Sequence, residues 1–301
     1  MSEAATRSLR GLPVRLLSRL ILALPWSALP PLASCIGWLW TYLIPVRRSL
    51  MRRNLDLAFP DMDAAWRRSV IRECCTQFAL TGLELFWLPR MDRAWVDRHV
   101  RFLDPELPRR LLEQGKGLVC VGGHYGNWEV MGAATSLSGL PLSYIVKRVA
   151  DPEFDRLVND SRRSAGVEII YTREAGRLVL KHLRRNRLVA FLSDQDARSR
   201  GIFVNFMGQP ASTPQGAAVY ALRLGTPMLF VNDRRLANGH HEIEFSQIPV
   251  DPDWTLCDEH VQALTQRFTT LLEERVRAHP AQWFWMHRRW KTQPVPPEHG
   301  R

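Results

Sequence analysis

One stretch, residues 117–129 (Gly-Leu-Val-Cys-Val-Gly-Gly-His-Tyr-Gly-Asn-Trp-Glu), constrains the fold more than any other part of the 301-residue chain. Its apolar run, Leu118–Val121, predicts a short buried strand. The two glycines that follow predict a turn in which the backbone can approach another group closely. Residues 127–138 then show a helical pattern. His124 is therefore expected between the carboxyl end of a strand and the start of a helix, which is where ligands bind in open α/β sheets.

Glu129 follows His124 by five residues. On one straight helix this separation is roughly 140° around the axis, given about 3.6 residues per turn, so the two side chains would not meet. With His124 in the turn and Glu129 in the first helical turns, the carboxylate can reach one ring nitrogen and leave the other free to take a proton. The helix N-terminus would place backbone N–H groups near a developing negative charge. A surface histidine beside an unrelated glutamate fits the spacing equally well.

Strand-like and helix-like segments alternate between residues 117 and 250, which predicts an α/β fold with a mixed, largely parallel sheet flanked by helices. The expected strands are 118–121, 143–146, 168–171, 188–192, 227–231 and 242–245, and the expected helices are 63–88, 127–138, 152–165, 174–186, 214–224 and 261–276. We expect one α/β domain over residues 47–294, an N-terminal helical membrane-associating segment over 1–46 and a flexible tail over 295–301.

The N-terminal region has the composition of a membrane anchor. Residues 20–46 carry no charge and include four tryptophan or tyrosine residues, and an apolar stretch of this length can cross a bilayer. Three prolines interrupt it, which predicts an amphipathic helix at 12–24 and an apolar helix at 32–44. Arginines lie on both sides of the stretch, which suits an anchor lying on an anionic cytoplasmic leaflet. A single membrane span and an exported chain are the alternatives.

Basic residues outnumber acidic residues by 41 to 30, which gives a formal net charge of +11. Most of the basic residues are arginines, whose planar guanidinium groups suit phosphate binding. The charge fits nucleic acid, an anionic membrane or an acidic carrier protein, and a biased genome composition would produce it as well. The chain has no zinc-finger spacing or RNA-recognition signature, so we expect no nucleic acid partner. Its five cysteines lack a C-x-x-C pair and fit a reducing compartment.

Five motifs, in order along about residues 10–294, resemble the lipid A secondary acyltransferases, also called lauroyl or myristoyl acyltransferases. The first motif is similar to the His-x4-Asp/Glu motif of the glycerolipid-type acyltransferases. In this sequence the motifs are His124-Tyr-Gly-Asn-Trp-Glu129; Val146-Lys147-Arg148 with Asp151-Pro152; Ser193-Asp194-Gln195-Asp196; Phe203–Gly208 with Ala211, Thr213 and Gly216; and Trp285–Thr292. Three positions depart from the family pattern: Lys147 replaces an aromatic residue, Gln195 replaces a histidine and Asp151 replaces an asparagine.

The resemblance implies an acyltransferase at the cytoplasmic face of the bacterial inner membrane. It would move a fatty acyl group from the thioester of acyl-carrier protein to a hydroxyl of a lipid A precursor, forming an acyloxyacyl group. The acidic carrier suits a positively charged chain. No Walker or dinucleotide glycine motif is present, so we expect no nucleotide cofactor. The alternatives are an acyltransferase for another lysophospholipid or glycolipid, a thioesterase-like hydrolase and an inactive membrane-binding protein.

The expected site combines a base, a group that stabilises the oxyanion and an apolar slot for the acyl chain. His124 is expected to be the general base, with Glu129 as its orienting partner. Direct attack by the lipid hydroxyl is favoured over a covalent route through Cys120, because a cysteine on this strand is expected to be buried and inert. The expected substrate-binding residues are Gly126, Asn127, Arg148, Asp194, Asp196 and Arg288.

Several of these residues end apolar runs, as His124 does. Arg148 is expected to contact the oxyanion or a substrate phosphate. At least one of Asp194 and Asp196 is expected to pair with Arg148 or with another arginine of the site, because no third ligand is spaced to complete a metal site with them. The basic segment 287–289 either binds an acidic headgroup or simply lies on the surface.

Overall fold

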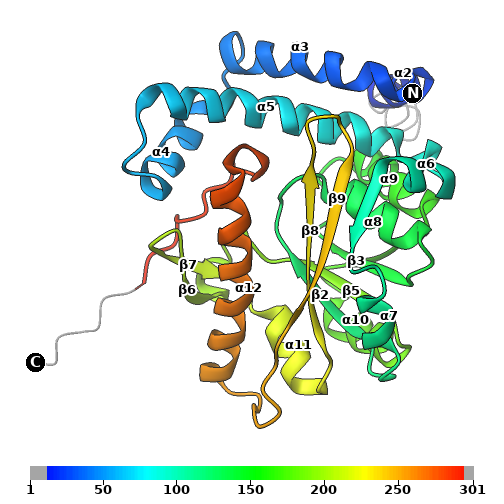
Figure 1. The fold of residues 1–301 in the computed structure, drawn as a ribbon, viewed down its shortest axis with the longest axis vertical. Helices are drawn as coiled ribbons and strands as arrows, with labels where there is room; N and C mark the ends of the chain where they lie inside the picture. Colours follow the sequence, from blue (N-terminus) through cyan, green and yellow to red (C-terminus); the bar gives the residue numbers. More distant parts are fainter. Residues whose placement is uncertain (1–11, 295–301) are drawn as a thin grey trace, which may run out of the picture.

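The computed structural model describes residues 12–294, and a seven-stranded sheet forms the centre of the molecule (Figure 1). The strands are β1 (Val100–Leu103), β2 (Leu118–Gly122), β3 (Leu142–Val146), β4 (Glu168–Tyr171), β5 (Leu188–Leu192), β8 (Met228–Arg235) and β9 (His241–Ile248). Their order is β1-β9-β8-β2-β5-β3-β4. β8 and β9 pair antiparallel, and the other neighbours pair parallel. The predicted mixed, largely parallel sheet is therefore confirmed.

Helices cover both faces of this sheet. The α-helices within residues 12–294 are α2 (Leu12–Ala23), α3 (Leu29–Tyr42), α4 (Arg48–Ala58), α5 (Ala64–Trp87), α6 (Arg93–His99), α7 (Leu107–Leu112), α8 (Trp128–Leu137), α9 (Pro152–Ser164), α10 (Ala175–Arg184), α11 (Gly216–Leu224) and α12 (Asp258–Ala278). Side chains alternate between the faces of a strand. Val119 and Val121 of β2 join the core that contains α10, α11 and α12, whereas Leu118 and Cys120 join the core that contains α8.

A two-stranded hairpin of β6 (Ile202–Phe206) and β7 (Gln209–Thr213) was not expected as strands. Met207 and Gly208 connect the two strands with φ values of 57° and 78°. Two successive positive φ values are typical of a tight hairpin turn, which usually carries Asn-Gly or Asp-Gly. The Met-Gly pair lacks that sequence signal. The predicted strands and helices, in contrast, are present with shifted ends.

The N-terminal helices lie along α5 on the outside of the domain (Figure 1). α3 starts at Leu29, earlier than the predicted residue 32, because Pro30 and Pro31 occupy its first turn, where a helix does not need their missing N–H groups. No single helix within residues 12–294 is long and apolar enough to cross a bilayer. Taken together, the helical segments Leu12–Ala23 and Trp26–Tyr42 have the length and composition of a membrane span, but the chain is bent by 114° between them.

Close packing holds α3 against α5. Leu29 and Ala33 are fully buried, and a Cβ atom added at Gly37 would lie 2.6 Å from the Thr76 Cα atom. Other large apolar side chains of the N-terminal helices are exposed: Leu12, Leu16, Leu17, Leu20, Trp38, Leu39 and Tyr42. The start of the predicted anchor and the predicted tail at 295–301 lie outside the described residues.

Gly37→Val is expected to destabilise the protein by about 1–3 kcal/mol, because the added side chain cannot fit against the α5 backbone. Urea unfolding followed by circular dichroism measures this change. Gly82→Ala on α5 is the matched control, since nothing lies within 4 Å of a Cβ atom at Gly82. Equal unfolding midpoints for wild type and Gly37→Val would show that α3 does not depend on this contact.

Candidate active site

The carboxyl ends of β2 and β5 lie side by side, because Gly122 pairs with Leu192 at the end of their parallel ladder. The turn after β2 carries His124, and the turn after β5 carries Asp194. The Ser193 N–H donates to the Gly122 carbonyl at 3.0 Å and fixes one turn against the other. The sheet therefore brings together two polar residues that are far apart in sequence.

His124 and Asp194 form a hydrogen-bonded pair. The His124 ring donates from Nδ1 to Asp194 Oδ1 at 2.7 Å, and the His124 backbone N–H donates to Oδ2 at 2.8 Å. Trp283 Nε1 also donates to Oδ2, at 2.9 Å. Burial alone would raise the pKa of the Asp194 carboxyl, but the His124 imidazole and these three donors lower it to about 2. An ionised carboxylate on Nδ1 fixes the tautomer and leaves Nε2 free to accept a proton.

An apolar slot of about 530 Å³ opens beside the His124 ring. Its walls include Leu85, Trp128, Ile145, Val146, Phe154, Val158, Phe191 and Leu192. The Trp128 ring stands nearly perpendicular to the imidazole, with the ring centroids 4.9 Å apart. Pro214 and Gly216, at the start of α11, also line the slot. The dimensions and the apolar walls suit a hydrocarbon chain.

A second cavity, a basic cleft of about 980 Å³, lies next to the slot. Seven cationic side chains line it: Arg47, Arg53, Lys147, Arg198, Arg200, Arg288 and Lys291. Asp196 is the acidic residue of its lining, and none of the seven cations forms an ion pair with a described carboxylate. Lys147 and Gln195 line both the slot and the basic cleft. Gln195 Nε2 lies 3.4 Å from His124 Nε2, so a residue that lines both cavities contacts the ring nitrogen that faces away from Asp194.

The sequence profile of the bacterial lipid A biosynthesis acyltransferases matches residues 13–292. The chain belongs to this family. It is 26% identical over 285 residues to a lipid A biosynthesis acyltransferase of Haemophilus influenzae (92% of this chain, 88% of the relative) and 24% identical over 281 residues to the lipid A biosynthesis lauroyltransferase of Escherichia coli (91% and 89%). It is also 23% identical over 244 residues to a phosphatidylinositol mannoside acyltransferase of Mycolicibacterium smegmatis (80% and 78%). The prediction of an acyltransferase is confirmed.

In this acyltransferase the predicted contact between Glu129 and His124 is not formed. Glu129 lies in the first turn of α8, where its side chain turns toward α9 and accepts bonds from Arg162 Nε and Nη2 at 2.8 and 2.6 Å. Trp128 Nε1 also donates to Glu129, at 2.9 Å. Asp194 takes the position on the imidazole instead, although at least one of Asp194 and Asp196 was expected to pair with an arginine. Glu129 thus connects to His124 through the Trp128 ring, and its place among the catalytic residues stays a prediction.

The turn that carries His124 is held by buried groups on every side. Gly126 has a φ of 57°, and a Cβ atom there would lie 2.0 Å from the Asp233 carbonyl oxygen. The Asn127 backbone N–H donates to Asp233 Oδ2 at 2.6 Å, while its side chain caps α8 and donates to Glu84. Because the Asn127 side chain is fully buried and engaged in these bonds, it holds the turn and does not face the cavities, contrary to its predicted role in substrate binding.

Behind this turn lies a buried charge network that sequence patterns did not reveal. Arg235 donates through Nη1 and Nη2 to Glu84 and through Nε to Gln77. His241 Nδ1 contacts both oxygens of Asp233 at 3.0 Å. Burial would raise the pKa of Glu84, but Arg235 and His241 lower it to about 2. The helical pattern placed Glu84 on a packed helix, and no local signal identified Arg235 as its partner.

Of the remaining predicted residues, Asp196 and Arg288 line the basic cleft and Arg148 does not. Arg288 is exposed and lines it, whereas Arg148 is exposed with its guanidinium carbon 4.6 Å from the centroid of the Tyr171 ring. Asp196 accepts from the Thr292 hydroxyl at 3.0 Å, and its backbone N–H donates to His287 Nε2 at 2.9 Å. Neither Asp194 nor Asp196 pairs with Arg148. The substrate-binding roles of Arg148, Asp196 and Arg288 stay predictions.

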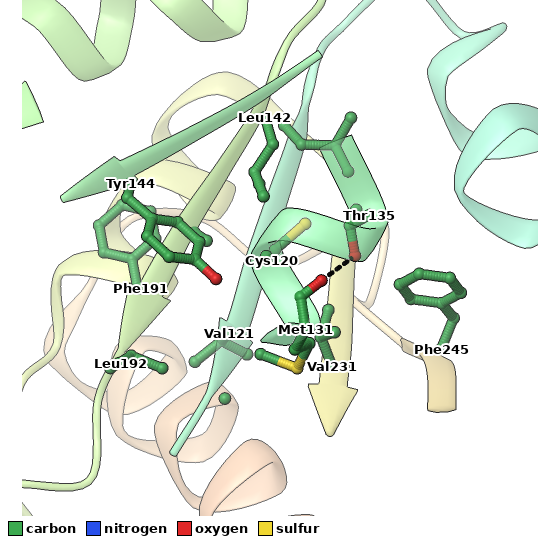
Figure 2. Close-up of a pocket in the computed structure, with 14 residues that line it drawn as sticks. Cys120, Val121, Met131, Thr135, Leu142, Tyr144, Phe191, Leu192, Val231 and Phe245 are labelled. Carbon is green, nitrogen blue, oxygen red and sulfur yellow. Dashed lines mark hydrogen bonds between the residues drawn. The ribbon is translucent and has the colours of Figure 1, made fainter. Parts of the chain in front are cut away.

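Cys120 lies in the core and does not line the slot beside His124. Figure 2 shows its side chain in an inner apolar cavity under α8, beside Met131 and Tyr144. Burial raises the pKa of the Cys120 thiol, which disfavours the thiolate that a covalent route would require. Tyr144 and Phe191 line both this cavity and the slot. Within residues 12–294, no group of three or more His, Cys, Asp or Glu side chains is placed to hold a metal ion.

Asp194→Asn is expected to lower kcat by about 10²–10⁴-fold with little change in stability, because the amide no longer stabilises a protonated His124.

Glu129→Gln is expected to lower the free energy of unfolding by about 3–5 kcal/mol, because it leaves Arg162 without its buried partner. Steady-state kinetics and thermal unfolding of the two variants separate these roles. A stable but inactive Glu129→Gln variant, together with an active Asp194→Asn variant, would reverse the assignment.

Proposed function

We propose that the protein transfers a fatty acyl group from the thioester of acyl-carrier protein to a hydroxyl of a lipid A precursor, forming an acyloxyacyl group without a cofactor. The observation that carries this proposal is that His124 lines the apolar slot while its Nε2 lies 3.4 Å from Nε2 of Gln195, which lines both the slot and the basic cleft. The slot suits the acyl chain, and the basic cleft suits the phosphates of an acidic headgroup.

The transfer proceeds by direct attack. His124 Nε2 takes the proton of the acceptor hydroxyl while the hydroxyl oxygen bonds to the thioester carbonyl carbon. When the carbon–sulfur bond breaks, the imidazolium returns the proton to the leaving thiolate. Asp194 stabilises the imidazolium between these two transfers. Lys147 and Gln195 line both cavities, which suits them to stabilise the carbonyl oxygen as it becomes negative.

The acidic acyl-carrier protein is the proposed donor because the chain has a net charge of +11, which favours association with an acidic partner. A phosphorylated lipid A precursor is the proposed acceptor because the seven cations of the basic cleft have no carboxylate partners within residues 12–294. One relative is named for phosphatidylinositol mannoside, so an acidic glycolipid is the second candidate acceptor.

The protein is proposed to lie on the cytoplasmic face of the bacterial inner membrane, with its N-terminal helices in the interface. Leu16, Leu20 and Trp38 are 49%, 66% and 51% exposed. Exposed apolar and aromatic side chains beside arginines are typical of helices that lie at an anionic membrane surface. The basic cleft begins directly after α3, with Arg47 and Arg53, so a lipid headgroup at the same surface can enter it.

Purified protein, acyl-carrier protein loaded with a fatty acid and a lipid A precursor are expected to yield a product heavier by one acyl group, measured by mass spectrometry. His124→Ala is expected to lower the rate by about 10²–10⁴-fold. Parallel reactions with a phosphatidylinositol mannoside, with acyl-CoA and with no acceptor separate the alternatives. Free fatty acid as the sole product in every reaction would contradict the proposal and indicate a hydrolase.

The absence of a covalent intermediate is tested separately. Labelled acyl-carrier protein without acceptor is expected to leave no label on the denatured polypeptide, and Cys120→Ala is expected to stay active. Label on the wild type that disappears in Cys120→Ala would make Cys120 the nucleophile.

Replacing Leu16, Leu20 and Trp38 together with serine is expected to move the protein from the membrane pellet to the soluble fraction, because the substitutions remove the apolar surface that would enter the bilayer. Each exposed position should change the free energy of unfolding by no more than about 0.5 kcal/mol. Leu256→Ser is the matched control, since Leu256 is 50% exposed in the loop before α12. That loop and α3 lie at opposite ends of the molecule (Figure 1). An unchanged pellet fraction for the triple variant would place the anchor elsewhere.

A further inference from the structure

Arg289 is a buried cation without an ion-pair partner among the described carboxylates. Its side chain is 1% exposed. Nη1 donates to the Ser212 carbonyl at 2.6 Å, and Nη2 donates to the Thr213 hydroxyl. Nε is buried and has no hydrogen-bond partner in the described part of the chain. Since buried donors are nearly always satisfied by protein groups or by ordered water, this nitrogen requires a partner.

A small cavity of about 10 Å³ connects Arg289 with Asp194, as both residues line it. Thr269 lines it too, and its hydroxyl donates to the Thr265 carbonyl at 2.8 Å, so its lone pairs are free to accept. The Asp194 carboxylate has about four acceptor positions, and hydrogen bonds from His124 and Trp283 occupy three of them. The space is that of about one water molecule, and a buried water needs two to four polar partners. The cavity offers both the space and the partners.

We propose that a single water in this cavity links Arg289 Nε to the Asp194 carboxylate, and that Arg289 is the positioning residue for the pair of Asp194 and His124. Its charge balances Asp194, so that the carboxylate orients the imidazole without retaining the proton that the imidazole takes. This inference rests on the proposed role of His124 as a base. It assigns a function to a residue of the C-terminal motif that faces neither the slot nor the basic cleft.

Electrostatics agrees with the geometry. Burial lowers the pKa of Arg289 to about 10, and the negative charges of Asp194 and Asp196 oppose this shift. The guanidinium therefore stays charged at neutral pH. Burial also lowers the pKa of His287, and the negative charges of Asp194 and Asp196 oppose that shift.

Other charged groups around His124 are engaged or exposed. The titratable and charged side chains that face it from the surrounding elements are Lys147, Asp155, Arg162, Asp194 and His287. Arg162 is paired with Glu129, and Asp155 accepts from the Tyr171 hydroxyl at 2.8 Å. Lys147 is exposed, so solvent screens its charge. Arg289 is the buried cation on the far side of the Asp194 carboxylate.

Arg289→Met is expected to move the acid limb of the pH profile of kcat/KM upward by about one pH unit, as is typical when a charge next to a buried pair is removed. Without Arg289, the uncompensated Asp194 charge favours the protonated imidazole, which cannot act as a base. Arg289→Lys keeps the charge and is expected to shift the limb by less than half as much. Arg288→Met, at the exposed neighbouring position, is expected to raise the KM for the acceptor lipid and leave the limb in place. An Arg289→Met limb that coincides with that of wild type would overturn the proposal.

Two measurements do not depend on acyl transfer. His124 can be followed by NMR in protein labelled at its histidines, and its signal is assigned with a His124→Gln variant. In Arg289→Met, the titration midpoint of His124 is expected to show the same upward shift. If acyl transfer fails but this midpoint moves, the link stands and the proposed function fails. A crystal structure of the unaltered protein is expected to show one water at hydrogen-bond distance from both Arg289 Nε and Asp194. An empty cavity, or a water that contacts Arg289 but not Asp194, would overturn the proposal even if Arg289→Met does not fold.

Discussion

The parallel pairing of β2 with β5 is the constraint on which the site depends. It aligns Gly122 with Leu192, and so places the turn with His124 against the turn with Asp194. His124 lines the slot at this edge of the sheet, and its Nε2 contacts Gln195, which also lines the basic cleft. An insertion of one residue in either strand would reverse which face each side chain occupies, and the hydrogen-bonded pair would be lost together with the slot.

Buried charges hold the turn that carries His124, and burying charges is costly unless every group finds a partner. Glu84 is paired with Arg235, and Asp233 is paired with His241 and with the Asn127 backbone. An apolar filling of similar volume would often be as stable as such a network. The network differs from an apolar filling because its hydrogen bonds are directional and fix the Gly126–Asn127 backbone in one conformation. The fold thus uses ionic groups where it must place one imidazole accurately.

Local patterns predicted much of the fold and part of the site. Hydrophobic runs and glycines located β2, the turn and His124, since these signals lie within a few residues of one another. The partner of His124 was predicted wrongly, because the sequence shows spacing along the chain but not which strands are neighbours. Glu129 was close in sequence, whereas Asp194, 70 residues away, is close in space. The pairing of Glu84 with Arg235 across 151 residues was invisible for the same reason.

The segment after α12 completes the site from the far end of the chain. The Phe284 N–H donates to the His124 carbonyl, Trp283 donates to Asp194, and Arg288 and Lys291 form part of the basic cleft. During synthesis, His124 and Asp194 leave the ribosome about 90 residues or more before this segment does. A nascent chain therefore carries the imidazole and its carboxylate partner before it has the segment that holds them in place. Truncation ahead of Trp283 would remove one donor to Asp194 and one to the His124 carbonyl, while both residues of the pair remained in the chain.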